Sequence, residues 1–435
     1  MEPYLGEGCS VSCTRSVRDI GGAFTITLVD RAKSDLGDSL YYFSHPMDGV
    51  EIRMSHDDRS LPLVFRGFIS EVRREEVMGA DGRPNRRVII SGQSTGKILL
   101  MQKIYYAKGA VDSTELLSSW KFLDKYLKDG AKTFSVESFV DAVNNEILTP
   151  ALKVLTASSE MKVNFTTKVT SKGSVSPFFL NSFVDRSVYE LLSEACDVGP
   201  FNELYVDDKD GGIAEIVMRP NPFFMADGGL ADPDASPPDE IHIDNDDLVG
   251  ITHIRTDANV ANVYWVYTPE GLQSNSITRN EMYSKVDKSI WDIRKSYLEA
   301  LEKYYGYRVM EVSARLLEPG MSNPNAGKEG QVDSETELYV NWTKKRVLSL
   351  RDQNKDNGIF EKGSMQLYGN HQIKPGFMIL LQRKNVLTQY YAVSVTQNFE
   401  AYGVWTTHVQ FERGRSRLDR GSGDYAGEID RRGAM

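Results

Sequence analysis

The pentapeptide Gly92-Gln93-Ser94-Thr95-Gly96 is the stretch whose residue types come closest to a catalytic motif. It has the Gly-x-Ser-x-Gly pattern that, in serine hydrolases, exposes the nucleophile on a turn between a strand and a helix above a parallel sheet. The strands predicted before it alternate apolar and polar residues, which indicates an antiparallel sheet with one wet face instead. We therefore interpret the pentapeptide as a structural turn and keep a Ser94 esterase as an alternative function.

The same segment falls short of a phosphate-binding loop. Only three residues separate Gly92 from Gly96, and Ile98 stands where a hydroxyl that binds magnesium is required. Neither the loop length nor the metal ligand fits, so the sequence excludes a nucleotide site here.

Two acidic segments suggest calcium at first sight. In residues 207–212, aligning either glycine with the invariant glycine of a calcium loop puts Val206 at the first ligand position or Lys209 at the third. We therefore expect a turn that joins two strands. The carboxylates of residues 239–247 could chelate a cation or face a negatively charged lumen, and a solvated loop is the alternative.

The other polar residues form no pattern typical of a metal site or a catalytic pair. Cys9 and Cys13 would lie on one strand face about 13 Å apart, too far for a disulfide or a shared metal, so we expect both to be buried. With 61 acidic residues, any glycosidase pair would be an arbitrary choice. We therefore predict no catalytic residue, no metal ligand, no cofactor and no enzyme. Six histidines lack zinc-ligand spacing, namely His45, His56, His242, His253, His371 and His408.

The bulk composition is that of an ordinary globular protein. The chain has 435 residues, 40% hydrophobic and 26% charged, which is enough for two or three domains. Its formal net charge of −10 argues against a general nucleic-acid binder. No apolar run approaches the roughly 18 residues that cross a bilayer, and the opening residues do not resemble a secretory signal. We expect folding in a cytoplasm and no membrane insertion.

Alternating apolar residues predict antiparallel strands at both ends of the chain. In residues 10–93, for example, Phe24, Ile26 and Leu28 alternate with threonines, the period at which a strand presents one face to a core. In residues 358–414 four such strands follow one another, separated by residues typical of turns. We predict a small sheet or barrel at the N-terminal end and a meander with one wet face at the C-terminal end.

The middle of the chain has apolar residues at the spacing of amphipathic helices, interrupted by strand-like stretches. One helix start is marked by Ser187 and Glu190, which form a capping-box pattern. The predicted elements are two helices between Ser113 and Pro150, the first carrying Leu116 to Leu127 and the second ended by Pro150; a loop or short strand from Thr156 to Ser182; a short helix after Ser187; strands at 202–206 and 213–218; a surface loop at 227–239; strands at 248–255 and 261–267; a helix at 285–305; and a helix from Ser334 to about Arg351.

Three groups of segments, taken in this order, carry a resemblance to a known family. They are residues 24–30, 49–54 and 63–72; then 187–196 with 203–208; and finally 363–369, 374–377, 390–395 and 406–414. The first group resembles the N-terminal barrel, the second the helix and hairpin, and the third the final strands of phage tail baseplate hub proteins. That family includes the late-control protein D group and the hub part of secretion-system spike proteins.

The resemblance implies an α+β, mainly β fold with two tube-like antiparallel β-barrel domains and helical insertions. The division that we expect is an N-terminal barrel at 1–106, a helical insertion or linker at 107–185, a helix, hairpin and strands of the second barrel at 186–270, a helical insertion at 271–357, a meander completing the second barrel at 358–414, and a flexible tail at 415–435.

The resemblance also implies a function, the structural baseplate hub of a phage tail. Such a hub is a homotrimeric ring that adapts the sixfold tail tube to the threefold spike and surrounds the DNA channel. The implied partners are the tail tube protein, a separate central spike protein, and other baseplate or tape-measure proteins, and the genomic DNA passes without specific binding. The location would be the virion tail tip, after assembly in the host bacterial cytoplasm. The alternatives are the hub of a phage-derived injection machine or a tail-associated cell-wall hydrolase.

The last predicted strand supplies the candidate interface or lumen residues. Its alternating pattern places Thr406, His408, Gln410 and Glu412 on the wet face. We expect acidic side chains to line the channel, so that DNA slides past without binding. The residues expected in the core are Tyr391, Val393, Val409 and Phe411.

Overall fold

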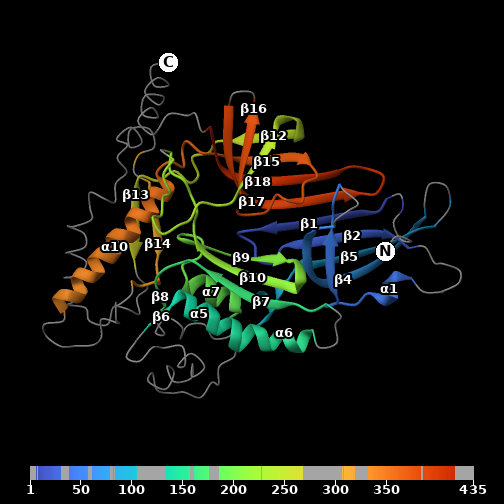
Figure 1. Cartoon of the computed structure of the whole chain (residues 1–435), viewed down its shortest axis with the longest axis horizontal. Coiled ribbons are helices and arrows are strands. Elements are labelled where there is room, and N and C mark those ends of the chain that lie inside the picture. The colour runs from blue at the N-terminus through green and yellow to red at the C-terminus, as the bar shows by residue number, and fades with distance from the viewer. Residues whose placement is uncertain are drawn as a thin grey trace.

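The structure is mainly β, with helices grouped in the middle of the chain, which confirms the predicted fold class (Figure 1). The predicted helices at 116–127 and 285–305 and the chain after residue 416 lie outside the described residues. The computed structural model describes residues 6, 8–30, 39–56, 61–78, 82, 84–104, 133–156, 161–175, 186–226, 228–267, 306, 308–318, 332–383 and 386–416.

The N-terminal strands form a first β-unit in the order β1-β2-β5-β4-β3, in which every neighbouring pair is antiparallel. Phe24, Ile26 and Leu28 are buried in its core, while Thr25 between them is exposed, as the alternation predicts. Its elements are β1 (Ser10–Ser16), β2 (Ala23–Val29), α1 (Leu40–Phe43), β3 (Gly49–Arg53), β4 (Leu63–Met78), β5 (Pro84–Ser94) and α2 (Lys97–Met101).

The C-terminal strands form a second β-unit with the same connectivity. Its order is β12-β15-β18-β17-β16, again antiparallel throughout, and β11 adds to β16 in parallel. Tyr390, Val409 and Phe411 lie in its core. Its elements are β11 (Glu240–Asp244), a 3-10 turn (Asn245–Asp247), β12 (Leu248–Ile254), β15 (Glu361–Tyr368), β16 (Met378–Arg383), β17 (Val386–Glu400) and β18 (Trp405–Ser416).

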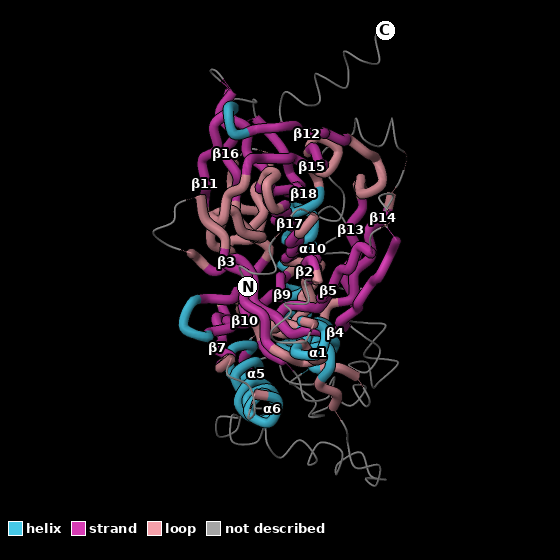
Figure 2. The backbone as a smooth tube through the Cα atoms, turned by 90° about the vertical axis from the view of Figure 1, so that its right-hand side faces the viewer, coloured by secondary structure: helices cyan, strands magenta, loops and turns pink. Residues whose placement is uncertain are grey.

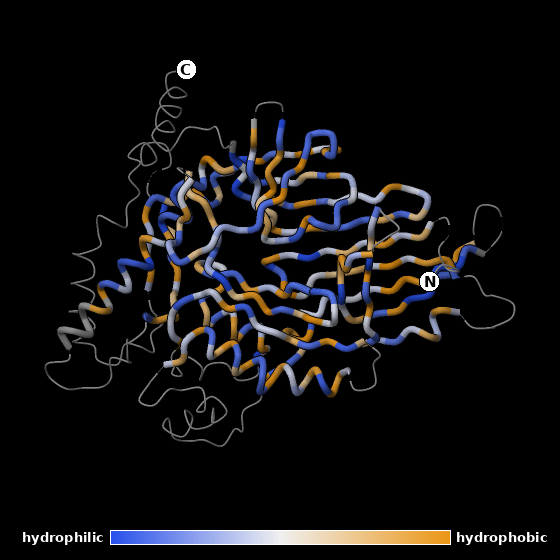
Figure 3. The backbone as a smooth tube through the Cα atoms, viewed as in Figure 1, coloured by the Kyte–Doolittle hydropathy of each residue, from blue (hydrophilic) through white to orange (hydrophobic). Residues whose placement is uncertain are grey.

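The two β-units are joined edge to edge into one eleven-stranded sheet. Residues 10–16 of β1 pair with residues 394–400 of β17, so the first strand of the chain lies beside the C-terminal hairpin (Figure 1). Among the described strands, the pairing path is open, running from β12 at one end to β3 at the other. Hydrophilic and hydrophobic residues alternate along these strands (Figure 3).

A smaller module of sheet and helices packs against the N-terminal β-unit (Figure 2). Its sheet has the order β7-β10-β9, and the helices cover it with a core that includes Phe139, Leu191 and Ile216. The predicted capping box is confirmed, since Ser187 and Glu190 bond reciprocally to each other's backbone N–H. The elements are β6 (Phe134–Ser135), α5 (Val136–Val143), a π-helical turn (Asn144–Leu148), α6 (Thr149–Leu155), β7 (Asn164–Val169), β8 (Ser174–Val175), α7 (Val188–Ala195), β9 (Asn202–Lys209), a 3-10 turn (Asp210–Gly212) and β10 (Ile213–Pro220).

Two predicted helix boundaries are wrong. Pro150 does not end a helix but lies in the first turn of α6, directly after the π-helical turn. The missing N–H of a proline is tolerated there, because the wider turn already interrupts the regular hydrogen-bond ladder. Ser334 does not start a helix either, since α10 (Val332–Asn354) begins two residues earlier. Acidic and hydroxyl residues also suit the first turn itself, so the short capping pattern did not fix the boundary.

A third group of elements lies beside this module. β13 (Val263–Tyr267) and β14 (Val309–Ser313) form a parallel pair, and α10 packs on it through Trp342, Tyr264 and Val347. The indole of Trp342 donates a 2.7 Å hydrogen bond to the carbonyl of Leu316. A buried polar anchor therefore fixes α10 onto the chain that follows β14.

Replacing Gly363 by alanine tests the close packing of β12 on β15. A Cβ atom at this position would lie 1.8 Å from the carbonyl oxygen of Thr252, which is backbone and cannot rotate away. We expect Gly363→Ala to lower the free energy of unfolding by about 1–3 kcal/mol in urea titrations, as overpacking does. Gly250→Ala in β12 is the matched control, because its Cβ would meet no atom within 4 Å. Equal stabilities of the two variants would contradict this account.

Candidate functional site: a polar face shared by both β-units

The candidate residues of β18 lie on one side of the large sheet. Gln410 is exposed and Thr406, His408 and Glu412 are half-buried, whereas the residues between them point into the core. The prediction that they share the wet face of a strand agrees with this burial pattern. The buried residues between them are Trp405, Thr407, Val409 and Phe411.

Strand pairing extends this surface over both β-units. Directly paired residues of antiparallel strands project to the same face, so each row of partners makes a continuous strip. Most of the residues are half-buried or exposed, with Ser394 a buried exception. We call the following three rows the polar face: Thr252, Ser364, Gln410, Ser394 and Ser16; Gln366, His408, Thr396 and Thr14; and Tyr368, Thr406, Asn398, Ser12, Thr25, Ser91 and Glu71.

Hydroxyl and amide groups of the polar face also hold the two β-units together. The hydroxyl of Ser12 donates to Oδ1 of Asn398 at 2.7 Å, and the hydroxyls of Thr14 and Thr396 lie 2.8 Å apart. These residues were not among the predicted candidates. The signal was present in the sequence, since hydroxyl residues alternate from Ser10 to Ser16, but their partners in β17 are known only from the fold.

The polar face is hydrophilic but largely uncharged. Its rows contain one carboxylate, Glu71, one imidazole, His408, and one phenol, Tyr368, among serines, threonines and amides. Of the four predicted candidates only Glu412 carries a carboxylate, and it forms an ion pair with Arg18. Surfaces of this composition bind water well but lack the clustered cations that hold phosphate groups. The expected acidic lining of a channel therefore stays a prediction for other parts of the surface.

Behind the polar face, at the junction of the two β-units, Gln397 forms a buried polar network. Its Oε1 accepts from Trp405 Nε1 at 2.9 Å and from the hydroxyl of Thr407 at 2.7 Å, and its Nε2 donates to the carbonyl of Asn370 at 2.8 Å. A buried amide needs such partners, because an unpaired one costs free energy. The network fixes the side chains of three C-terminal segments at the β1–β17 junction.

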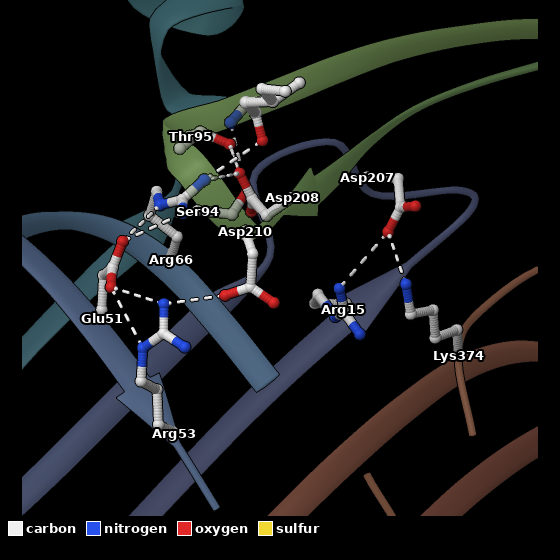
Figure 4. A network of polar contacts seen from close by, with 12 residues as sticks. Arg15, Glu51, Arg53, Arg66, Ser94, Thr95, Asp207, Asp208, Asp210 and Lys374 are labelled. Atoms are coloured by element: carbon white, nitrogen blue, oxygen red, sulfur yellow. Dashed lines mark hydrogen bonds and ion pairs between the residues drawn. The ribbon is translucent and has the colours of Figure 1, made fainter. Parts of the chain in front are cut away.

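A cluster of charged residues ties the hairpin of β9 and β10 to the N-terminal β-unit (Figure 4). The buried guanidinium of Arg66 in β4 lies 2.9 Å from Glu51 and 4.0 Å from Asp208. Arg53 bridges Glu51 and Asp210 at 3.1 and 2.8 Å. Two ion pairs thus lead from β3 and β4 to the tip of the hairpin.

The same cluster corrects the prediction for residues 207–212. Only Asp210–Gly212 form the turn, in which Gly211 and Gly212 adopt positive φ angles of 77° and 78°. Asp207 and Asp208 belong to β9 instead. Asp208 is buried because it faces Arg66, a long-range contact that local turn chemistry cannot indicate.

The Gly-x-Ser-x-Gly pentapeptide connects β5 to α2 and serves the packing of these elements. Ser94 is buried, and its hydroxyl donates to the carbonyl of Ile20 at 3.0 Å. The hydroxyl of Thr95 donates to Asp208 at 2.7 Å. Among the hydrogen bonds of the described residues, none joins Ser94 to a histidine. The interpretation as a structural turn agrees with these contacts.

A second buried cluster ties the central hairpin to the C-terminal β-unit. Glu203 of β9 accepts from Arg219 of β10 at 3.1 Å and from the hydroxyl of Tyr391 in β17 at 2.6 Å. Arg219 also donates to that hydroxyl, at 3.1 Å. Burial raises the pKa of Glu203, and the nearby guanidinium opposes that rise. The hairpin therefore contacts both β-units through buried charges.

No metal site is found in the described part of the chain, where no three histidine, cysteine or acidic residues cluster suitably. Within residues 239–247, Glu240–Asp244 form β11 and Asn245–Asp247 form a 3-10 turn. Cys9, Cys13 and Cys196 are buried and form no disulfide, as predicted for the first two, and burial raises the pKa of Cys13 to about 12. None of the described helices has the length and apolar character of a membrane span.

Replacing Asp208 tests the cost of its buried carboxylate. Burial raises its pKa from 3.8 to about 6, so the folded state holds the proton more tightly than the unfolded state. Its contribution to stability is therefore complete below pH 3.8 and is lost as the pH rises to about 6. Asp208→Asn keeps a neutral group, so we expect this variant to gain about 2 kcal/mol relative to the unaltered protein between pH 4 and 7.

Unfolding in urea at both pH values measures this gain. Thr95→Val is the control, because it keeps the carboxyl group of Asp208 but removes the hydrogen bond from Thr95 that lowers the pKa of Asp208. That variant should lose more stability than the unaltered protein over the same pH interval. A stability difference between Asp208→Asn and the unaltered protein that does not change with pH would contradict the assignment.

Comparisons with known proteins find similar folds among solved structures. No family model matches the sequence. No curated protein matches it either. The fold is similar to the 43 kDa tail protein of prophage MuSo2 from Shewanella oneidensis, at 10% identity, 93% coverage of each chain and a TM-score of 0.43.

Two further solved structures are similar over most of the chain. A tail protein from Neisseria meningitidis has 10% identity, with 93% of this chain and 91% of that chain covered and a TM-score of 0.45. The c3393 protein of E. coli, a type VI secretion system component, has 9% identity, with 93% and 73% covered and a TM-score of 0.38. All three similarities have sequence identities of 10% or less and TM-scores below 0.5.

Proposed function

We propose that this chain is the structural baseplate hub of a phage tail, a homotrimer that forms a ring around the DNA channel. The observation that carries the proposal is the single sheet in which two β-units of equal connectivity are joined edge to edge. A chain with two like units can present six like surfaces from three copies, which suits a sixfold tube on one side and a threefold spike on the other.

The polar face supports a channel role. A surface of hydroxyl and amide groups stays hydrated and offers few cations to the phosphates of a passing duplex. DNA would therefore pass without specific binding. Along these rows the side chains that line the channel would be mainly neutral rather than acidic. In this proposal Thr406, His408 and Gln410 face the lumen. Glu412, which forms an ion pair with Arg18 of the same chain, lies near the interface between copies.

The proposed partners follow from this role. They are the tail tube protein, a central spike protein and other baseplate or tape-measure proteins, in a virion tail tip assembled in the host cytoplasm. The domain division at residues 106, 185, 270, 357 and 414 is part of the proposal. A hub of a phage-derived injection machine would use the same geometry.

Purified protein viewed by negative-stain electron microscopy tests the ring. We expect particles of threefold symmetry with a central hole, and a mass in solution of three chains by light scattering. Compact monomers at concentrations of about 100 µM, well above those at which specific oligomers form, would contradict the proposal.

A lysine substitution tests whether the polar face forms the channel wall. Gln410→Lys places one cation per copy on the face, so the assembled ring should retain duplex DNA at low salt and release it as salt rises. Val154→Lys is the matched control, because it adds the same charge at an exposed site on α6. Equal DNA retention by both variants would show that the polar face does not line the channel.

A further inference from the structure

The two β-units repeat one another strand by strand, which allows the environment of one to be compared with that of the other. In chain order, the strands of the first unit pair as first-second-fifth-fourth-third, and those of the second unit do the same when β12, β15, β16, β17 and β18 are numbered in turn. The equivalent of β1 is therefore β12, and the equivalent of β4 is β17.

The repeat extends to single residues. In the first unit Ser12 pairs with Thr25, which pairs with Ser91, which pairs with Glu71. In the second unit Thr252, Ser364, Gln410 and Ser394 form the same succession. Ser12 is thus equivalent to Thr252, and Glu71 to Ser394.

An irregularity in the long strands supports this alignment. The pairing of β4 with β5 shifts between Ile69 and Glu71. The pairing of β17 with β18 shifts twice, and the later shift, between Ala392 and Ser394, is the equivalent one. Each of these two equivalent shifts directly follows the stretch that pairs with the third strand of its unit, β3 or β16. The shift therefore marks the same point in both units.

The equivalent edges differ in one respect. After its shift, β17 pairs with β1 along residues 394–400. After its shift, β4 pairs only with β5 among the described strands, so residues 71–78 present a free edge. Free edges are ready to pair with another chain.

β12 is the equivalent of β1, which pairs with the equivalent edge of β17, so β12 is the strand expected to pair with this edge of β4. It pairs only with β15 among the described strands. Five of its seven residues are exposed, whereas β1, which has neighbours on both sides, has no exposed residue. Among the described strands, residues 71–78 of β4 thus have a neighbour on one side only, and so does β12.

We propose that β12 of one copy pairs antiparallel with residues 71–78 of β4 in the next copy, in the register of the β1–β17 pair. Ser12 pairs with Asn398, four residues after Ser394. The equivalent partner of Thr252 is therefore Glu75, four residues after Glu71, in the neighbouring copy. The inference rests on the proposed ring, for which it supplies the contact.

This register covers apolar side chains that are exposed in the single chain. Val249 would pair with Met78, and Gly250 with Val77, of the neighbouring copy. Val249 is 50% exposed, Val77 62% and Met78 70%. The contact joins two different surfaces, so it passes from copy to copy and ends only when a ring closes. The polar face would continue across it, because Thr252 and Glu75 extend its rows.

Disulfide trapping tests the register. Paired Cα atoms in antiparallel strands lie roughly 4.5–5.5 Å apart, within the range that a disulfide spans. In the double variant Thr252→Cys with Glu75→Cys, mild oxidation should produce covalent closed oligomers on a non-reducing gel. A mixture of the two single variants should produce only covalent dimers, and each single variant alone should produce none. The natural cysteines are all buried and add little background.

Two controls make the outcome specific. Ser12→Cys with Asn398→Cys reproduces the template pair and should close within one chain, without a change in mass. Thr252→Cys with Glu71→Cys is out of register by four residues, about 13 Å along the strand, and should not cross-link. Rings that form without a cross-link at Thr252 and Glu75, or that cross-link equally out of register, would overturn the inference and leave the proposed hub standing. Protein that stays monomeric would overturn both.

Discussion

The pairing of β1 with β17 is the contact on which the rest of the structure depends. It joins residues 10–16 to residues 394–400, almost the full length of the chain apart. Each backbone hydrogen bond of such a ladder contributes only about 1 kcal/mol net, so side chains must help to define it. Ser12, Thr14 and Gln397 do so, on opposite faces of the junction. β1 is an edge strand of the first β-unit, and residues 394–400 of β17 extend beyond the part that pairs with β16. One ladder between these two segments therefore turns two small sheets into a single large one.

The central hairpin of β9 and β10 reinforces this union from a second direction. Asp208 and its neighbours contact the N-terminal β-unit, while Glu203 and Arg219 contact the C-terminal one. Buried ion pairs of this kind add little net stability, since desolvation offsets their attraction. They do destabilise other orientations of the hairpin and the β-units, because any arrangement that separates the charged partners leaves a buried charge uncompensated. The clusters therefore act mainly on the relative orientation of the units.

The uncharged polar face is a consequence of both features. A sheet with one face on a core must expose the other, and residues on that face are free to vary in chemistry. Along β1, β17 and β18 they are hydroxyls and amides apart from His408, and these groups hydrate well and pair with one another across strands. A single unit would give a narrow strip, whereas the joined sheet extends the strip over both units. The repeat also explains why β4 and β12 each keep an unpaired edge among the described strands, since a chain with two units can form only one of two equivalent junctions.

The sequence alone determined the mainly β class, the strands near both ends and the capped helix at Ser187, because periodicity and capping are local properties. It also placed Thr406, His408 and Gln410 on one face of a strand. Only the tertiary structure decided which strands are neighbours, and hence that Ser12 lies beside Asn398 and that Asp208 is buried against Arg66. Pairing between distant segments depends on how the two cores fit together, and no short pattern encodes it. For the same reason the repeat could not be recognised from the sequence, since the two β-units share strand order and register rather than residue types.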